Sequence, residues 1–109
     1  MSSLVIPAGG VIRVSRATFD PERFVEVERM LRETATYLSP PIKRLGGLLG
    51  YYAGASPEGS VVAVSLWDSN AHAGQMGSLK EMTVDARRDA KAVGVSAPTI
   101  LNYSLAWQI

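Results

Sequence analysis

Tyr51 and Trp67 are well suited to hold an aromatic ligand, because they stand on either side of a predicted tight hairpin. In the simplest register of that hairpin, Tyr51 lies opposite Ser65 and Leu49 opposite Trp67, so both rings project from one face of one sheet. A buried tyrosine hydroxyl needs a hydrogen-bond partner, and a ligand phenol or carbonyl could be that partner. Trp67 could equally fill a sheet edge or a dimer seam, and a one-residue slip would exchange the two faces.

Three polar residues add candidate chemistry. His72, the only histidine in the sequence, falls in the first turn of a short predicted helix and could act as a lone general base. With no second His and no carboxylate cluster beyond Asp68, it is not expected to bind a metal, and a surface or capping role is its plain alternative. Arg13 could orient an anionic substrate or form a salt bridge in a dimer. We expect catalytic roles for His72 and Asn70, and ligand contacts from Trp67, Tyr51, Ser65 and Arg13.

The composition excludes several classes of function. The 109 residues are 47% hydrophobic and 19% charged, so we expect one globular domain over 1–109, with a flexible N-terminal arm over 1–10. The net charge is +1 and the basic residues are dispersed, which argues against nucleic acid as a partner. No apolar stretch approaches the ~20 residues that cross a bilayer, so no membrane association is expected.

The cysteine count and the N-terminus bear on the compartment. There is no cysteine, which excludes disulfides and thiolate metal sites and suits a reducing cytoplasm. The N-terminus lacks a charged n-region, and Pro7 and Gly9 interrupt its apolar run, so no signal peptide is predicted. We therefore expect a cytoplasmic protein without metal or cofactor.

The hydrophobic periodicity predicts alternating strands and helices. Residues 11–17 alternate as a strand, and Asp20 followed by Pro21 can begin a helix that Pro40-Pro41 should end. A strand over 45–55 and a strand over 61–67 are predicted next. They are followed by a short helix that Ser69 caps and Gly77 closes, and by a second helix that runs from the capping box Ser78-Leu79-Lys80-Glu81 to Gly94. The last predicted element is a strand from about Thr99 to Gln108.

This βαββαβ order predicts a ferredoxin-like α+β sandwich, with helices on one face of a four-stranded antiparallel sheet. In the simplest register, Val62, Val64 and Leu66 face the helices. The bare face would then carry Tyr51, Ala63, Ser65, Trp67, Arg13 and Ser15. Such a mixed surface is too apolar for open water, so we expect a second copy to cover it.

Two further face assignments follow from hydrophobicity. We assign Leu101, Tyr103 and Leu105 of the last strand to the helix side, because they resemble core residues. Tyr52 is expected to pack beneath the helices, with Gly50 and Gly54 admitting a close helix.

The fold order, Gly46-Gly47 at the start of the second strand, and Val64-Ser65-Leu66-Trp67-Asp68-Ser69 at the end of the third resemble the antibiotic biosynthesis monooxygenase-like dimeric α+β barrels. The resemblance covers roughly 11–107 and implies a homodimer of facing sheets, each protomer enclosing a small pocket between sheet and helices. Trp67 matches the family tryptophan. Some members oxygenate aromatic polyketides without metal or flavin, using Asn, Trp and Tyr, for which this chain offers Asn70, Asn102, Tyr51, Tyr52 and Tyr103.

Other members of that group degrade haem, with an Asn in the first strand and a His in the long helix after the Trp. This chain has no Asn over 11–18 and no His over 79–93, so haem degradation is not expected. The sequence therefore predicts a dimeric α+β barrel that binds a small aromatic or polyketide-like ligand, with cofactor-independent monooxygenase as the candidate activity. The alternative is a non-catalytic dimeric ligand-binding or interaction module.

Overall fold

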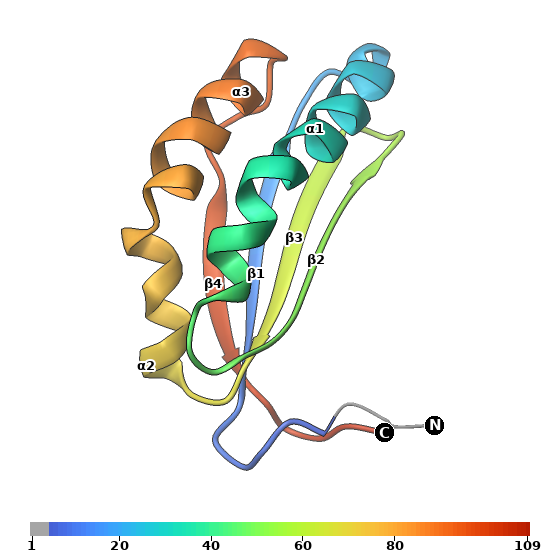
Figure 1. Cartoon of the computed structure of the whole chain (residues 1–109). Helices are drawn as coiled ribbons and strands as arrows, with labels where there is room; N and C mark the ends of the chain where they lie inside the picture. The colour runs from blue at the N-terminus through green and yellow to red at the C-terminus, as the bar shows by residue number, and fades with distance from the viewer. Residues whose placement is uncertain (1–4) are drawn as a thin grey trace.

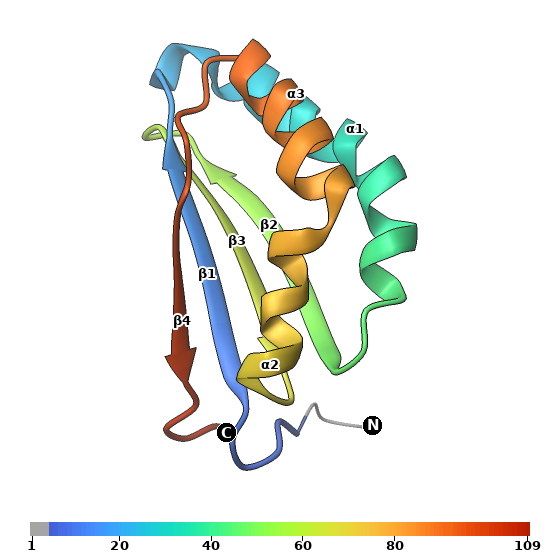
Figure 2. The same cartoon turned by 90° about the vertical axis from the view of Figure 1, so that its left-hand side faces the viewer.

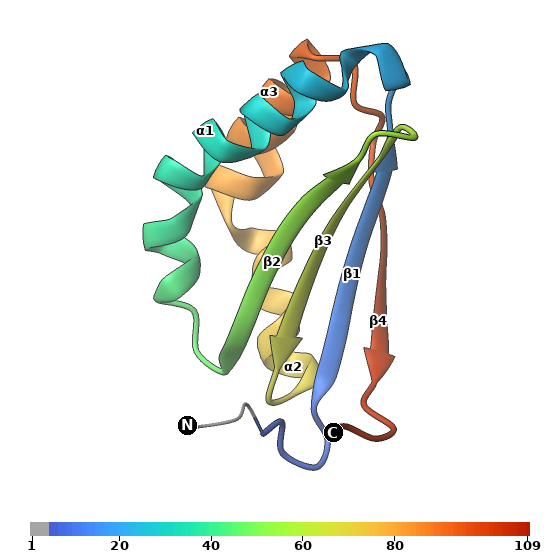
Figure 3. The ribbon, with the colours of Figure 1, turned by 90° about the vertical axis from the view of Figure 1, so that its right-hand side faces the viewer.

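The computed structural model describes residues 5–109 and has the expected ferredoxin-like order of elements (Figure 1). The strands follow the order β2-β3-β1-β4 across one sheet, and all neighbouring strands are antiparallel. Figures 2 and 3, from opposite sides, show every helix on the same side of that sheet. No helix in the described part of the chain is long and apolar enough to span a bilayer. The main elements are β1 (Val11–Thr18), α1 (Phe24–Lys43), β2 (Leu48–Ser56), β3 (Ser60–Trp67), α2 (Asn70–Ala73), α3 (Arg87–Ala92) and β4 (Thr99–Ser104).

The first helix begins as expected and ends later. The Asp20 side chain accepts a hydrogen bond from the Glu22 amide, and a 3₁₀ turn over Pro21–Arg23 leads into α1. The prediction that Pro40-Pro41 end the helix was wrong, because α1 continues to Lys43. The two prolines remove backbone donors within the last turns but keep helical φ angles, so one more turn forms before Gly47 reverses the chain at φ +77°.

The second helical stretch is built from several short helices. Ser69 caps α2 by accepting a hydrogen bond from the His72 amide, 3.2 Å, as predicted. A 3₁₀ segment over Gly74–Ser78 follows, and a π-helical segment over Glu81–Ala86 runs into α3. The predicted capping box is not formed at that start, where no side chain caps the helix. Gly94, at φ +82°, follows the end of α3.

The hairpin register is the predicted one over most of its length. Ala55 pairs with Val61, Ala53 with Ala63 and Tyr51 with Ser65. The prediction fails at the end, where a bulge between Leu48 and Gly50 places Leu48, not Leu49, opposite Trp67. The extra residue re-aims the strand at its entry from α1.

The face assignment of the hairpin was reversed. Trp67 is fully buried in a cluster beneath the helices, with Tyr51 packed against it and Ser65 also buried. Because side chains alternate along a strand, Val62, Val64 and Leu66 therefore lie on the bare face. The bare face is as rich in β-branched residues as a core, so hydrophobicity alone could not tell the two faces apart. Three other residues predicted on the bare face also lie on the helix side, namely Arg13, Ser15 and Ala63.

The faces predicted for the last strand and for Tyr52 were also wrong. Leu101 pairs with Val14 and Tyr103 with Ile12 on the bare face, where Leu101 and Tyr103 are 53% and 49% exposed. β4 ends at Ser104, before Leu105. Tyr52 is also exposed on this face, and Gly50 leaves room for its ring instead of for a helix.

The core beneath the helices forms two separate clusters. One surrounds Trp67 and includes Val11, Ile42 and Met76. The other lies at the opposite end of the sheet, around Val27 of α1. The helix-facing side chains of the strands between these clusters are small or polar.

The residues that precede β1 lie beside the end of the chain (Figure 1). Ile6 is buried, its amide donates to Gln108 Oε1 at 2.9 Å, and Gln108 Nε2 donates to the Ile6 carbonyl at 2.7 Å. Residues 1–4 of the expected N-terminal arm lie outside the described residues.

Candidate ligand site

Four polar side chains form one row across the helix-facing side of the sheet. Asn102 of β4 pairs with Arg13 of β1, Arg13 with Ser65 of β3, and Ser65 with Tyr51 of β2. Partners in antiparallel register point to the same face, so all four side chains face the helices. We call Asn102, Arg13, Ser65 and Tyr51 the polar row.

Trp67 flanks this row on one side, two residues beyond Ser65 on β3. The indole is fully buried, and its Nε1–H donates to Ser65 Oγ at 2.8 Å within the core. This bond satisfies the only polar atom of the indole and fixes the plane of the ring beside Tyr51. Ser65 keeps its own O–H available as a donor.

Small residues lie on the other side of the row. Ser15, Ala63 and Ala53 form the next level across β1, β3 and β2, and we call them the small row. None of them belongs to either core cluster. Ser15 and Ala63 keep some solvent-accessible surface although both lie in central strands. The side chains of the small row therefore fill little of the space between the two core clusters.

The helix layer over this region includes α1, which carries Thr34, and a π-helical segment that spans the distance between the two core clusters. Thr34 is buried and its hydroxyl donates to the Leu31 carbonyl at 3.1 Å. The segment Glu81–Ala86 carries Met82 into the Trp67 cluster, whereas α3 carries Ala90 to the other cluster. π-Helical turns occur often at functional sites.

The charges of the polar row are unbalanced. Burial lowers the pKa of Arg13, and no carboxylate pairs with it among the described residues. Burial also raises the pKa of Tyr51, and the nearby Arg13 charge acts in the opposite direction. A partly buried cation without a counter-charge attracts anions.

A pair of amides connects the row to α2. Arg13 Nη1 donates to Asn102 Oδ1 at 3.4 Å, and Asn102 Nδ2 donates to Asn70 Oδ1 at 3.2 Å. Asn70, predicted as a site residue, therefore reaches the row through Asn102. Asn102 was only one of several candidate amides in the sequence. Its alternation with Leu101 and Tyr103 does indicate that Asn102 points to the opposite face of β4 from those two residues, but the prediction assigned that face to the bare side of the sheet.

His72 points elsewhere. Its Nδ1 is hydrogen-bonded to Asp68 Oδ1 at 2.6 Å, and this bond lowers the pKa of the Asp68 carboxyl. A Cβ placed on Gly46 would lie 3.7 Å from His72 Nε2, so the imidazole faces the loop between α1 and β2. Asn70 is directed to the β4 edge and His72 to the β2 edge. The structure thus brings together Arg13, Tyr51, Ser65, Trp67 and Asn70, but not His72.

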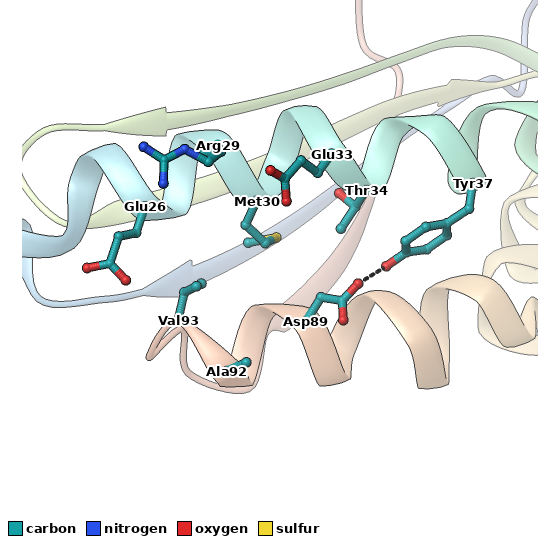
Figure 4. Close-up of a pocket in the computed structure, with 9 residues that line it drawn as sticks. All are labelled: Glu26, Arg29, Met30, Glu33, Thr34, Tyr37, Asp89, Ala92 and Val93. Atoms are coloured by element: carbon teal, nitrogen blue, oxygen red, sulfur yellow. Dashed lines mark hydrogen bonds between the residues drawn. The ribbon is translucent and has the colours of Figure 1, made fainter.

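Two surface grooves lie outside this region. The groove between α1 and α3, about 420 Å³, has Met30 and Val93 among apolar lining residues and is crossed by a 2.7 Å hydrogen bond from Tyr37 to Asp89 (Figure 4). The other, about 400 Å³, lies along β1 and β4 and includes Leu101 and Tyr103 of the bare face. Sequence periodicity signalled neither groove.

Comparison with solved structures places the arrangement among known folds. A monooxygenase from the gene ActVA-Orf6 of Streptomyces coelicolor, in complex with nanaomycin D, is 17% identical with a TM-score of 0.71, and the match covers 92% of this chain and 90% of that one. SnoaB, a cofactor-independent oxygenase from Streptomyces nogalater, is 16% identical with a TM-score of 0.63 and coverages of 94% and 98%. A dimeric ferredoxin-like protein of unknown function from Bacteroides fragilis is 13% identical with a TM-score of 0.65 and coverages of 89% and 97%.

Other matched structures are described as candidate antibiotic biosynthesis monooxygenases. The chain has the antibiotic biosynthesis monooxygenase-like fold. The resemblance expected from the sequence is confirmed at the level of structure. Comparisons with protein-family models and with curated proteins find no match. The antibiotic biosynthesis monooxygenase-like fold therefore supplies the architecture, and any activity must be argued from the polar row.

Proposed function

We propose that the protein binds a small aromatic or polyketide-like molecule between the sheet and the helices. The observation that carries the proposal is the polar row, which lies beside the buried Trp67 and faces the helix layer where the core is divided in two. Aromatic ligands suit sites that combine apolar walls with a few convergent polar groups. The ligand complex of the Streptomyces coelicolor monooxygenase supports this choice.

The candidate reaction is a cofactor-independent monooxygenation of a phenol. Deprotonation gives a phenolate, which can pass electron density to dioxygen, and the site contributes orientation and exclusion of water. In the balanced reaction, one phenol and one O₂ give one quinone and one water, with all four electrons supplied by the substrate. The cofactor-independent oxygenase SnoaB, which shares the fold, supports this class.

The residues proposed to line the site are Trp67, Tyr51, Ser65, Arg13 and Asn70. His72 remains the candidate for a general base, but its bond to Asp68 and its contact with the loop give that role no geometric support. The imidazole would have to leave Asp68 to approach the polar row.

The test separates binding from turnover. Wild-type protein is titrated with dihydroxynaphthalenes and hydroxyanthrones while tryptophan fluorescence is recorded, and oxygen uptake is then followed with each compound that binds. We expect binding and uptake in wild type, and loss of uptake in Trp67→Ala with an unchanged circular dichroism spectrum. Binding without uptake would favour the non-catalytic binding module instead. His72→Ala should lower uptake without weakening binding if His72 is the base, and should change neither if it is a structural residue.

We also propose that the protein is a homodimer whose two sheets meet at their bare faces. That face exposes Leu101, Tyr103 and Tyr52, and exposed apolar side chains gathered on one face are typical of protein interfaces. The dimeric Bacteroides fragilis protein of the same fold supports this arrangement. Because the candidate site lies on the other face of each sheet, its polar row remains available within each protomer.

A further inference from the structure

We infer that the site selects ligands carrying an anionic oxygen, a carboxylate or a phenolate, which Arg13 binds directly within the polar row. This inference names the ligand class of the proposed function and therefore rests on it. It is carried by the position of one cation and by the chemistry of the side chains around it.

Arg13 is the only charged member of the polar row. It lies in a central strand on the helix-facing side, in register between Ser65 and Asn102. Its one side-chain hydrogen bond among the described residues is the 3.4 Å contact with an amide oxygen. An arginine carries several N–H donors in a planar fork, so most of this fork is unused. A planar donor fork matches a carboxylate.

The neighbouring groups are also donors. Ser65 Oγ already accepts from the Trp67 indole, so its remaining O–H is free to donate toward the row. The hydroxyl of Tyr51 makes no hydrogen bond within the described residues, and it is not among their buried unsatisfied atoms, of which there are none. The Tyr51 hydroxyl therefore faces accessible space.

Within residues 5–109, no carboxylate pairs with this cation. Asp68, the nearest acidic residue in the chain to Trp67, is occupied by His72 on the β2 side. The other ion pairs of the described residues lie on α1 or in the stretch from Lys80 to Asp89. An uncharged ligand would cover the partly buried Arg13 and leave its charge without a partner, whereas an anionic oxygen would neutralise that charge.

Asn70 and Asn102 act as positioning residues. Asn102 accepts from Arg13 and donates to Asn70, so the two amides hold the guanidinium from the side of β4. Among the described residues, the other donors of the fork have no hydrogen-bond partner. Asn102→Ala should therefore weaken binding of an anion and should barely affect that of a neutral analogue.

The test compares two probes of one shape, 3-hydroxy-2-naphthoate and its uncharged amide. Binding is followed by quenching of Trp67 in a Trp107→Phe background, because Trp107 is 76% exposed and is the only other tryptophan. We expect the carboxylate to bind at least tenfold more tightly than the amide at neutral pH. That preference should disappear in Arg13→Gln and persist in Arg13→Lys. Arg32→Gln, which removes the same charge from an exposed site on α1, should leave the preference intact.

The outcomes separate this inference from the proposed function. If both probes bind with equal affinity, anion selection is wrong while ligand binding stands. A preference that survives Arg13→Gln, in protein with a wild-type circular dichroism spectrum, would assign the anion to another cation and overturn the inference. If neither probe binds, the proposed ligand class and the anion site fail together.

Discussion

At the scale of single residues, the bond between Trp67 and Ser65 decides how the site wall is built. The indole N–H has one partner, Ser65 Oγ, in a fully buried position. We expect Ser65→Ala to lower the free energy of unfolding by about 1–3 kcal/mol, because the buried indole donor is left without an acceptor. Urea denaturation followed by circular dichroism measures the change.

Two variants show whether this cost belongs to the indole bond. Ser15→Ala, on the same face in the small row, should change stability by less than about 0.5 kcal/mol, because no hydrogen bond of the Ser15 side chain is found in the described part of the chain. In a Trp67→Phe background, Ser65→Ala should cost much less than in wild type. An equal cost in both backgrounds would mean that Ser65 acts through something other than the indole.

The sequence predicted which residues belong to the candidate site better than it predicted how those residues are arranged in space. Tyr51 and Ser65 were paired correctly because hairpin register is set by the turn, and alternation along the first strand placed Arg13 on the same face as these two residues. The pairing of Asn102 with Arg13 depends on how β4 joins the sheet, which no local pattern reports. The sequence placed His72 near Trp67, but the direction of a side chain on a four-residue helix depends on what that helix packs against.

At the scale of elements, the sequence predicted strand order and hairpin register but reversed the faces. The prediction placed Val62, Val64 and Leu66 beneath the helices as a consequence of the simplest register. Both faces of this sheet are apolar enough to be covered, so the alternation identifies two faces without saying which one lies beneath helices. The small row was the better signal, since small residues allow a ligand to enter where a core would need volume.

A side-chain hydrogen bond connects α1 to α3. Tyr37 of α1 donates to Asp89 of α3 at 2.7 Å (Figure 4). Burial and this bond raise the pKa of Tyr37, and the bond lowers the pKa of Asp89. The Asp89 carboxylate contributes its full stabilisation above its unfolded pKa of about 3.9, and this stabilisation is lost as pH falls through the lower folded pKa. The Tyr37 phenol contributes its full stabilisation below its unfolded pKa of about 10, and this stabilisation is lost as pH rises through the higher folded pKa.

We therefore expect Tyr37→Phe to lower stability most between about pH 4 and pH 10, with a smaller difference from wild type on either side. The effect should be small, because Asp89 is in contact with solvent. Urea denaturation of both proteins at about pH 3, 7 and 11 gives the profile. Asp89→Asn and the double variant complete a mutant cycle, and additive losses at neutral pH would show that the pair is not coupled.

The loop between α1 and β2 depends on one glycine. Gly47 has φ +77°, and a Cβ there would collide with Asp68 Oδ1 and His72 Nδ1. We expect Gly47→Ala to destabilise by about 1–3 kcal/mol, from backbone strain and from displacement of the Asp68–His72 pair. Gly74→Ala is the matched control, because Gly74 has φ −63° and open space around it, and it should be neutral or stabilise by up to about 1 kcal/mol. Thermal melts of both variants measure the difference. Equal melting temperatures would contradict the expected backbone strain at Gly47→Ala.

At the scale of the whole molecule, the two faces of the sheet have opposite characters. The face beneath the helices carries the polar row and the small row, and the bare face carries the continuous apolar surface around Val14, Val64 and Leu101. The two core clusters lie beneath the helices as usual, but a bare face usually carries polar side chains, and this one does not. A partner on the bare face and a ligand beneath the helices would together account for both.

The dimer can be tested by placing one charge on each side of the molecule. Leu101 on the bare face and Val84 in the helix layer are each 53% exposed, so glutamate at either position should be tolerated by a monomer. In a two-fold interface Leu101→Glu is buried twice, and each unpaired charge costs several kcal/mol. Light scattering across a dilution series should therefore give twice the chain mass of 11.7 kDa for wild type and Val84→Glu, and the single chain mass for Leu101→Glu. A wild-type monomer, or dissociation by Val84→Glu alone, would show that the sheets do not meet at their bare faces.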